Sequence, residues 1–308
     1  MTRSLLSETV TLGLPPRDTS SVCGVIVTYN PAPTLLENVA ALRPQVNSLA
    51  IVDNGSDSAS LEIVDHARRE FECEVILNGC NLGIAAALNA GVRYAESQNY
   101  DWVALFDQDS TVAASFVGNM LRTAEDHEDA EKIAILAPRY IDRESLVPMP
   151  LQADNRTGRI LANMTSGSMI PLNVFRRCDF FDESLFMDYV DHEFCLRVRN
   201  MGFVIVQSKT ATLLHSLGAR SSHELLGRTF VTTNHRAARR YYMTRNRMWL
   251  YKKYLWTDFA WTVRDARSLL IEIGKILLVE EDRRLKLHHI ALGFKDALAG
   301  HMGHRITL

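Results

Sequence analysis

Apolar runs and polar turn segments alternate regularly over the first third of the chain. The apolar runs cover residues 22–27, 49–52, 74–77 and 102–106. Each run ends near turn-forming residues, and stretches of helical length separate the runs, at residues 33–45, 60–70 and 81–97. Strands and helices in this alternation predict an α/β fold, in which a mostly parallel sheet has right-handed crossovers and is flanked by helices.

A polar residue follows each of the four predicted strands. These residues are Thr28, Asp53, Asn81 and Asp107. Each of them has an ordinary explanation as a turn former or a helix cap. Because the carboxyl ends of parallel strands lie at one edge of the sheet, we expect the four side chains close together and interpret them as one ligand site.

The fourth strand ends in two carboxylates that a single residue separates, Asp107 and Asp109. Residues two apart in an extended chain point to the same side, so both carboxylates could bind one divalent cation. A plain turn at the strand end is the alternative. The segment after the first strand, residues 28–31 (T-Y-N-P), has neither the glycine pattern of a dinucleotide site nor that of a P-loop. We therefore expect a metal ion such as Mg²⁺ to hold any phosphate groups.

Further candidate residues lie in the second half of the chain. Strands are expected at residues 132–138 and 164–170, and a polar surface loop at residues 141–160. Three acids then stand at the start of a predicted helix: Asp188, Asp191 and Glu193. The helix macrodipole favours acids there, so simple capping is one explanation of the cluster. His215 follows an apolar run, where a histidine is usually a core or edge residue.

The composition is ordinary for a globular protein, with 47% hydrophobic and 23% charged residues. A formal net charge of -2 excludes a chain-wide attraction to polyanions, so any attraction to nucleic acid or membrane must be local. The five cysteines are odd in number and form no C-x-x-C pair, which indicates a reducing compartment and buried free thiols. No apolar run reaches the length of an export signal or a membrane span, and we expect a soluble or peripheral protein.

The composition changes in the last quarter of the chain. Residues 235–254 contain seven lysines and arginines and five tyrosines and tryptophans, but no acid. Such a stretch is typical of a membrane-surface element, of a nucleic-acid-binding patch, or of a helix that docks its aromatic side chains on the core. Residues 258–300 have the pattern of two amphipathic helices, which could pack on the domain or join copies of the chain in a homo-oligomer.

A set of short motifs occurs in order along residues 22–220. The motifs are T-Y-N (28–30), V-D-N-G-S (52–56), N-x-G (81–83), N-A-G (89–91) and F-D-Q-D (106–109). Together they resemble the family 2 glycosyltransferases, which have the GT-A fold. The resemblance implies that Asp53 binds the imide edge of a uracil or thymine base, and that Asp107 and Asp109 hold a divalent metal, Mn²⁺ or Mg²⁺, with the diphosphate of a nucleotide-sugar donor. It also implies a nucleotide pocket lined by Thr28, Tyr29, Asn30, Asn81 and Gly83.

The resemblance further implies a catalytic base and a third metal ligand. The family pattern E-D-x-D-x-x-x-R has its base six residues before the arginine, which corresponds to Asp191 before Arg197. Because Val190 stands where the pattern has glutamate and Asp188 lies two residues earlier, Asp188 stays open as an alternative base. His215 lies in an H-x-x-G segment that resembles the family's late metal-binding histidine, and imidazole suits Mn²⁺ better than Mg²⁺.

The motifs, with the later segment Y-Y-M-T-R-N-R, look most like the bacterial rhamnosyltransferases, which use dTDP-L-rhamnose to build surface polysaccharides. This resemblance implies an inverting transferase that adds L-rhamnose to a polyprenyl-linked saccharide. The alternatives are transfer of another UDP- or dTDP-sugar, a sugar nucleotidyltransferase, or a non-catalytic subunit that binds a nucleotide sugar. Because sugar chemistry is expected, we interpret residues 235–254 as an element for an anionic membrane surface and expect no nucleic-acid partner.

These expectations divide the chain into three parts. Residues 1–20 are expected to be a flexible N-terminus. Residues 21–230 would form a GT-A catalytic domain, with a nucleotide-binding half at about 21–120 and an acceptor half at about 121–230. Residues 231–308 would form a helical basic and aromatic C-terminal region. The enzyme would work in the cytoplasm, peripherally on the inner face of the cell membrane.

Overall fold

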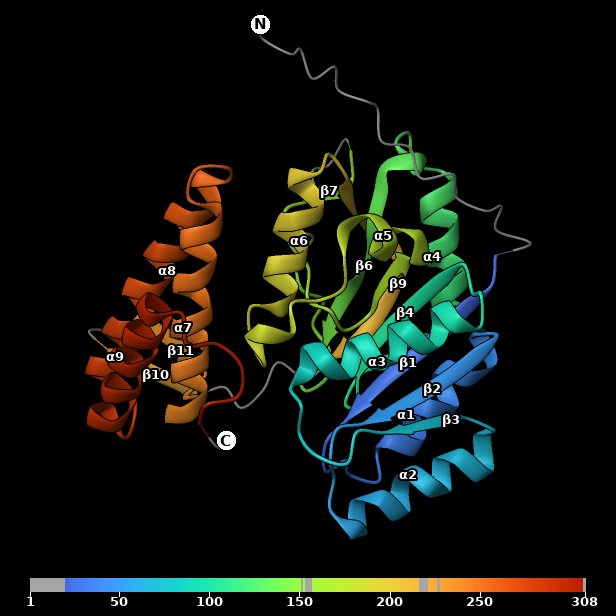
Figure 1. The fold of residues 1–308 in the computed structure, drawn as a ribbon, viewed down its shortest axis with the longest axis horizontal. Coiled ribbons are helices and arrows are strands. Elements are labelled where there is room, and N and C mark those ends of the chain that lie inside the picture. Colours follow the sequence, from blue (N-terminus) through green and yellow to red (C-terminus); the bar gives the residue numbers. More distant parts are fainter. Residues whose placement is uncertain (1–19, 151, 153–156, 216–220, 226–227, 307–308) are drawn as a thin grey trace, which may run out of the picture.

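A mixed β-sheet forms the centre of the chain and takes strands from both halves of the sequence (Figure 1). The computed structural model describes residues 20–150, 152, 157–215, 221–225 and 228–306. Within these ranges the sheet has the order β3-β2-β1-β4-β8-β6-β9-β5, with β7 paired to β9, and β10 and β11 form a separate antiparallel pair.

The elements have the following bounds. The strands are β1 (Val22–Thr28), β2 (Ser48–Asp53), β3 (Glu74–Leu77), β4 (Trp102–Asp107), β5 (Thr111–Val112), β6 (Ile133–Asp142), β7 (Arg159–Ile160), β8 (Ser168–Pro171), β9 (Val204–His215), β10 (Ser221–Leu225) and β11 (Arg228–Thr232). The α-helices are α1 (Leu35–Leu42), α2 (Ser58–Phe71), α3 (Ile84–Ser97), α4 (Phe116–Glu125), α5 (Leu172–Cys178), α6 (Val190–Asn200), α7 (Ala237–Tyr254), α8 (Phe259–Leu278) and α9 (Arg283–Ala299). Short 3₁₀ helices are η2 (Arg43–Gln45), η3 (Ala130–Lys132) and η4 (Glu183–Leu185).

The first four strands are parallel neighbours, which confirms the predicted α/β pattern. β1 pairs with β2 so that Thr28 lies opposite Asp53, and with β4 so that Val27 lies opposite Asp107. Three polar strand ends therefore reach one edge of the sheet within a residue of each other. Asn81, the fourth predicted residue, lies in the segment between β3 and α3.

The other half of the sheet differs from the predicted pattern. β6 continues past its predicted end to Asp142, and β9 runs without a break to His215. The strand expected over residues 164–170 begins only at Ser168 and lies antiparallel between β4 and β6. A turn at Gly167 precedes the strand. Gly167 has φ +82, and a Cβ there would lie 2.7 Å from two neighbouring side chains, so the turn requires glycine. The predicted loop at 141–160 contains β7 at its end.

Helices cover both faces of the sheet. Val25 packs with α3, α5 and α6 on one face, and Ile26 packs with α1, α2 and α4 on the other. Both side chains are buried, which explains why a doubly covered strand has a continuous apolar run. Four of the five cysteines are buried, as expected. Cys80 is exposed, which corrects that expectation, because it lies in the turn between β3 and α3.

Three helices at the end of the chain form a group beside α6 (Figure 1). α7 and α9 approach closely because Gly293 has no side chain; a Cβ there would lie 2.5 Å from the carbonyl oxygen of Tyr241. The two helices predicted within residues 258–300 are confirmed as α8 and α9. In the parts of the chain that the structure describes, no helix combines the length and the apolar character needed to cross a bilayer.

The acid-free stretch at residues 235–254 is only partly an exposed basic surface: Arg236, Arg239, Lys252 and Lys253 are exposed, whereas its other three cations are buried. In α7, Arg240, Arg245 and Arg247 are only 3%, 0% and 2% exposed. Carboxylates from distant parts of the chain pair with cations of the stretch, in the pairs Arg239–Asp188 (2.9 Å), Arg240–Glu280 (2.8 Å), Arg247–Asp265 (2.8 Å) and Lys253–Glu193 (2.7 Å). The stretch is therefore a docked helix whose counter-charges are remote in sequence.

Candidate active site

Asp53 fixes the backbone at the end of β2. Its buried carboxylate accepts hydrogen bonds from the backbone N–H groups of Gly55 (3.0 Å) and Ser56 (2.9 Å). The hydroxyls of Thr28 (3.1 Å) and Ser56 donate to its other oxygen. These four bonds occupy the acceptor positions of a carboxylate, so the carboxylate orders this turn. The predicted contact of Asp53 with a nucleobase stays a prediction.

The end of β1 is tied to the strand ends on both sides. The side-chain oxygen of Asn30 accepts a hydrogen bond from the backbone N–H of Asp57 (2.9 Å), beyond β2. The backbone N–H of Tyr29 donates to Oε1 of Gln108 (2.8 Å), beyond β4. The Tyr29 side chain is exposed at this edge. Both predicted pocket residues thus lie on the same rim as Asp53.

Asn81 and Gly83 connect this rim to the loop before α6. Oδ1 of Asn81 accepts from the side chain of Asn54 (3.0 Å) and from the backbone N–H of Gly83 (3.0 Å). Gly83 has φ +89, and a Cβ there would lie 2.4 Å from the carbonyl oxygen of Phe186. The next residue, Ile84, donates its backbone N–H to that same carbonyl at 2.7 Å. A glycine is therefore required for the close approach of α3 to this loop.

The structure brings Asp107, Asp109 and His215 together, as the sequence predicts. One ligand atom from each of these side chains lies within 4.8 Å of the others. Ser110 holds Nδ1 of His215 at 2.9 Å, and the hydroxyl of Ser166 lies 2.7 Å from that of Ser110. Two carboxylates and an imidazole at this spacing are a suitable donor set for Mn²⁺ or Mg²⁺.

The environment of Asp107 opposes its ionisation. Burial raises the pKa of Asp107 to about 6; His215 and Arg239 oppose this rise, whereas the charges of Asp109 and Asp191 add to it. A divalent cation would favour the ionised form, because metal ligands bind deprotonated. The cluster therefore has the excess negative charge that a cation would neutralise.

The two candidate bases differ in their surroundings. Asp191 lies in the first turn of α6, and its carboxylate accepts a hydrogen bond from the backbone N–H of His192 (2.8 Å). Asp188 precedes the helix with φ +58, and its carboxylate pairs with Nε (3.1 Å) and Nη2 (2.9 Å) of Arg239. The acidic cluster is thus split between a loop and a helix. Glu193 faces away from both and is buried with Arg197 and other partners.

A cavity of about 780 Å³ joins the cluster of Asp107, Asp109 and His215 to the C-terminal helices. Asp107 and His215 line it together with both candidate bases, Asp188 and Asp191. Its remaining wall includes one face of α8, with residues at helical spacing: Trp261, Arg264, Asp265, Ser268 and Glu272. The ring of Trp261 lies 5.9 Å from that of His192, beside Asp191. The cavity therefore offers room for a second substrate next to the predicted base.

Sequence reasoning missed several residues of this site. Ser110 and Ser166 orient His215, Arg239 engages Asp188, and α8 lines the cavity. Ser110 directly follows the F-D-Q-D motif, so its position there was a usable signal. Nothing in the local sequence indicates that α8 would reach the cavity.

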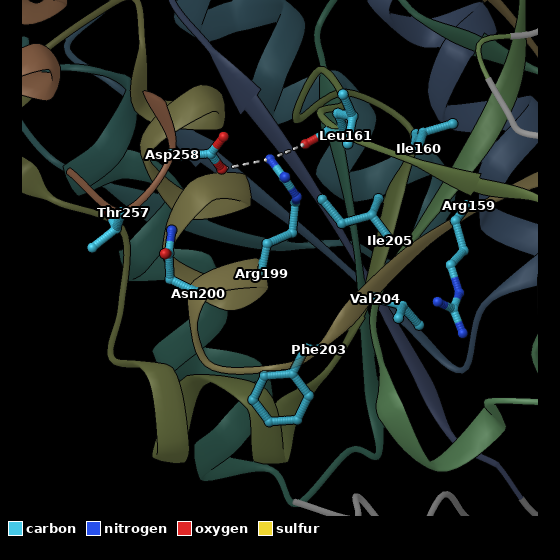
Figure 2. A pocket seen from close by; sticks show the side chains of 10 residues that line it. All are labelled: Arg159, Ile160, Leu161, Arg199, Asn200, Phe203, Val204, Ile205, Thr257 and Asp258. Atoms are coloured by element: carbon cyan, nitrogen blue, oxygen red, sulfur yellow. Dashed lines mark hydrogen bonds and ion pairs between the residues drawn. The ribbon is translucent and has the colours of Figure 1, made fainter. Parts of the chain in front are cut away.

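A second cavity, of about 370 Å³, lies away from these residues, between α6, β9 and the segment that joins α7 to α8 (Figure 2). Arg199 points to Asp258 (3.1 Å) and to the carbonyl oxygen of Leu161 (3.4 Å). Arg159, on the other side of the cavity, pairs with Asp129. The Arg199–Asp258 ion pair links α6 to the segment that joins α7 to α8. Among the described residues that line the cavity, each charged side chain has an oppositely charged partner.

The comparisons with known proteins agree with this geometry. Residues 23–181 match the family model "Glycosyl transferase family 2". A "dTDP-rhamnosyl transferase RfbF" of Shigella flexneri is 28% identical over 302 residues, an alignment that covers 92% of this chain and 97% of the relative.

Two solved structures share the fold. The mannosyltransferase PcManGT from Pyrobaculum calidifontis, in complex with GDP-Man and Mn²⁺, has a TM-score of 0.58 at 14% identity, with coverage of 93% of this chain and 90% of that chain. TarS 1-349 of S. aureus, in complex with UDP-GlcNAc, has a TM-score of 0.53 at 14% identity, with coverage of 91% and 73%.

Proposed function

The chain belongs to glycosyl transferase family 2 and has the GT-A fold, and from this premise we propose that it moves L-rhamnose from dTDP-L-rhamnose to a saccharide acceptor. The proposal rests on one observation: Asp191 lines the same cavity as Asp107 and His215, two members of the candidate metal site. The donor sugar is supported by the similarity to the S. flexneri relative, whose name states this donor class.

The nucleotide would lie at the ends of β1, β2 and β3. Six residues of this rim would line its pocket: Thr28, Tyr29, Asn30, Asp53, Asn81 and Gly83. Asp53 would accept the imide N–H of the base after the Ser56 hydroxyl rotates away, because all four acceptor positions are otherwise occupied. A divalent cation held by Asp107, Asp109 and His215 would neutralise the charge that develops on the departing diphosphate.

Asp191 is the proposed general base. It takes the proton of an acceptor hydroxyl while that oxygen bonds to the anomeric carbon, on the face opposite the diphosphate. The bond from the anomeric carbon to the phosphate oxygen breaks, the nucleoside diphosphate leaves, and the configuration inverts. Asp191 is better suited than Asp188 because the Asp188 carboxylate is bound by two nitrogens of Arg239. A positioned base supplies about 10²–10⁴ in rate.

The acceptor would be a polyprenyl-linked saccharide at the inner face of the cell membrane. Since α7 is docked, the support for membrane binding comes from α8. Its side facing solvent exposes Phe259, Val263, Leu270 and Leu277, which recur at spacings of four and seven residues, with Arg267 beside them. The opposite side of α8 lines the cavity. A bilayer against the exposed side would hold a lipid-linked acceptor near Asp191.

Product analysis with the full chain tests the proposed reaction. With Mn²⁺, dTDP-rhamnose and a saccharide acceptor the enzyme should release dTDP. Release of pyrophosphate from dTTP and rhamnose 1-phosphate would instead indicate a nucleotidyltransferase, and turnover of neither substrate pair a binding subunit. Asp191→Asn should lose about 10²–10⁴ in kcat and keep donor affinity. An inactive Asp188→Asn beside a fully active Asp191→Asn would reassign the base.

A thermal-shift panel tests the donor. Mn²⁺ with dTDP-rhamnose should stabilise the protein more than Mn²⁺ with UDP-galactose, UDP-glucose or GDP-mannose, because a ligand that binds only the native state raises its stability. Stabilisation by the GDP-sugar alone would overturn the donor assignment, since a purine presents a different edge to Asp53.

Vesicle flotation tests the membrane contact. The protein should float with anionic vesicles at low salt, and changing Leu270 and Leu277 to serine should abolish flotation. Leu146→Ser is the matched control, because Leu146 is an exposed leucine far from α8 in sequence. If the α8 variants change the oligomeric state in size-exclusion chromatography but not flotation, the face joins copies of the chain instead.

A further inference from the structure

The loop that leads into the catalytic helix has an unfavourable backbone. Phe186, Asp188 and Tyr189 have φ values of +62, +58 and +64. Residues that carry a side chain rarely adopt a positive φ. Such a backbone conformation persists only where surrounding contacts hold it. Asp191 follows two residues after the last of these positions, so its direction depends on what holds the loop.

Asn246, in the middle of α7, supplies that support. The side chain is fully buried, and its amide nitrogen lies within hydrogen-bonding distance of three loop carbonyl oxygens, those of Leu185 (2.8 Å), Met187 (2.7 Å) and Asp188 (2.9 Å). Arg245, next to it, donates to the same Leu185 carbonyl (3.0 Å). One turn of α7 therefore holds the loop in its conformation through these hydrogen bonds.

The neighbouring cations of α7 hold the side chains of the same loop. Arg239 pairs with the Asp188 carboxylate, and Arg247 donates to the Tyr189 hydroxyl. That hydroxyl lies 3.0 Å from Oδ1 of Asp265 on α8, the helix that lines the cavity. The loop is therefore bound both to α7 and, through the Tyr189 hydroxyl, to α8, which forms part of the cavity wall.

We propose that Asn246 is a positioning residue for the transfer reaction: its amide, with Arg245 and Arg247 on either side, holds residues 185–189 so that Asp191 points into the cavity that Asp107 lines. The proposal rests on the proposed function, in which Asp191 is the base. It gives the acid-free basic stretch a task in catalysis: its buried donors bind the carbonyls and the hydroxyl of the catalytic loop.

The expected signature is a loss of turnover without a loss of donor binding. Asn246→Asp keeps the shape of the side chain but sets a carboxylate against three carbonyl oxygens, so the loop must shift. A misplacement of about 1 Å at a reacting group can lower the rate about 100-fold. The hydrogen bonds of Asn246 go to the loop, which meets the donor rim where Gly83 and Ile84 approach Phe186. Donor affinity should therefore fall far less than kcat, by less than about threefold.

The experiment compares three variants of the full chain. Asn246→Asp should lower kcat about 100-fold with an unchanged Kd for dTDP, and Tyr189→Phe, which removes only the bridging hydroxyl, should lower kcat less. Asn200→Asp is the matched control: this asparagine also donates to a backbone carbonyl, that of Leu196 at 2.8 Å, at the far end of α6. It should keep wild-type kcat.

Hydrogen exchange supplies a readout of the loop itself. The Ile84 amide donates to the Phe186 carbonyl at 2.7 Å, so its exchange should accelerate in Asn246→Asp and stay slow in Asn200→Asp. A folded Asn246→Asp that keeps wild-type kcat, or loses activity only through weaker donor binding, overturns the proposal. If Asn246→Asp does not fold, wild-type kcat in Tyr189→Phe overturns it. Full activity of Asp191→Asn would instead refute the base assigned in the proposed function.

Discussion

Gly83→Ala would test the close approach between α3 and the loop that precedes Asp191. Gly83 has φ +89 and ψ 162, a backbone region that is almost restricted to glycine. An added Cβ would lie 2.4 Å from the Phe186 carbonyl oxygen, which is a backbone atom and not the end of a flexible side chain. Either α3 or the loop must therefore move.

Two contributions set the size of the effect. Placing a residue with a Cβ in this backbone region costs roughly 1–3 kcal/mol. Forcing a methyl group into filled space costs a further 1–3 kcal/mol or so, for a total of about 2–6 kcal/mol in the free energy of unfolding. If the loop shifts to relieve the contact, the Ile84 to Phe186 hydrogen bond of 2.7 Å lengthens and Asp191 moves with the loop. A shift of about 1 Å would lower kcat about 100-fold.

Gly79→Ala separates the two contributions. Gly79 also has a positive φ, +72, but a Cβ there would have nothing within 4 Å, so this variant carries only the backbone cost. Urea unfolding should show Gly83→Ala to be less stable than Gly79→Ala by about 1 kcal/mol or more. Steady-state kinetics should show a loss of kcat in Gly83→Ala alone. Equal stability of the two variants with unchanged kcat would refute the close-approach argument.

Three further results are expected. Asp109→Ala and His215→Ala should each raise the Mn²⁺ concentration needed for half-maximal activity, because each removes a ligand; an unchanged metal titration would contradict the site. Burial raises the pKa of Asp107 to about 6, so the native state keeps a proton that the unfolded chain loses near pH 4. With EDTA present, the Asp107 contribution to the unfolding free energy should fall by up to about 3 kcal/mol as pH rises from 4 to 6, measured as the difference between wild type and Asp107→Asn. Glu280→Gln should cost about 3–5 kcal/mol of stability, because it removes the buried carboxylate that Arg240 and Lys286 share and leaves Arg240 only its more distant partner Glu272 (3.3 Å). The exposed control Glu281→Gln should change stability little, and equal unfolding midpoints would show the Glu280 carboxylate to be dispensable.

In the first half of the chain the structure follows the pattern predicted from the sequence. The four apolar runs became β1 to β4, and Thr28, Asp53 and Asp107 reached one edge as predicted. Periodicity along the chain carries this information, because a buried parallel strand is apolar throughout and its end must turn. Motif order added His215, which local pattern alone would have left as an edge residue.

The acid-free stretch marks the limit of such reasoning. Its composition is that of an exposed basic helix, yet Arg240, Arg245 and Arg247 are buried. Their partners, such as Glu280 and Asp265, stand in other helices, and charge counted in a sequence window omits them. Ion pairs with residues elsewhere in the fold neutralise the positive charge that the stretch carries by itself.

The sequence by itself determined the strands, the polar edge and the carboxylates of the predicted metal site, because these follow from short-range period and from the shared direction of parallel strands. Only the tertiary structure decided that Arg239 pairs with Asp188, that Gly83 lies against the Phe186 carbonyl, and that Asn246 donates to the loop before Asp191. Residues 186, 188 and 189 adopt positive φ against their local preference, since contacts from α7, about 60 residues away, outweigh it.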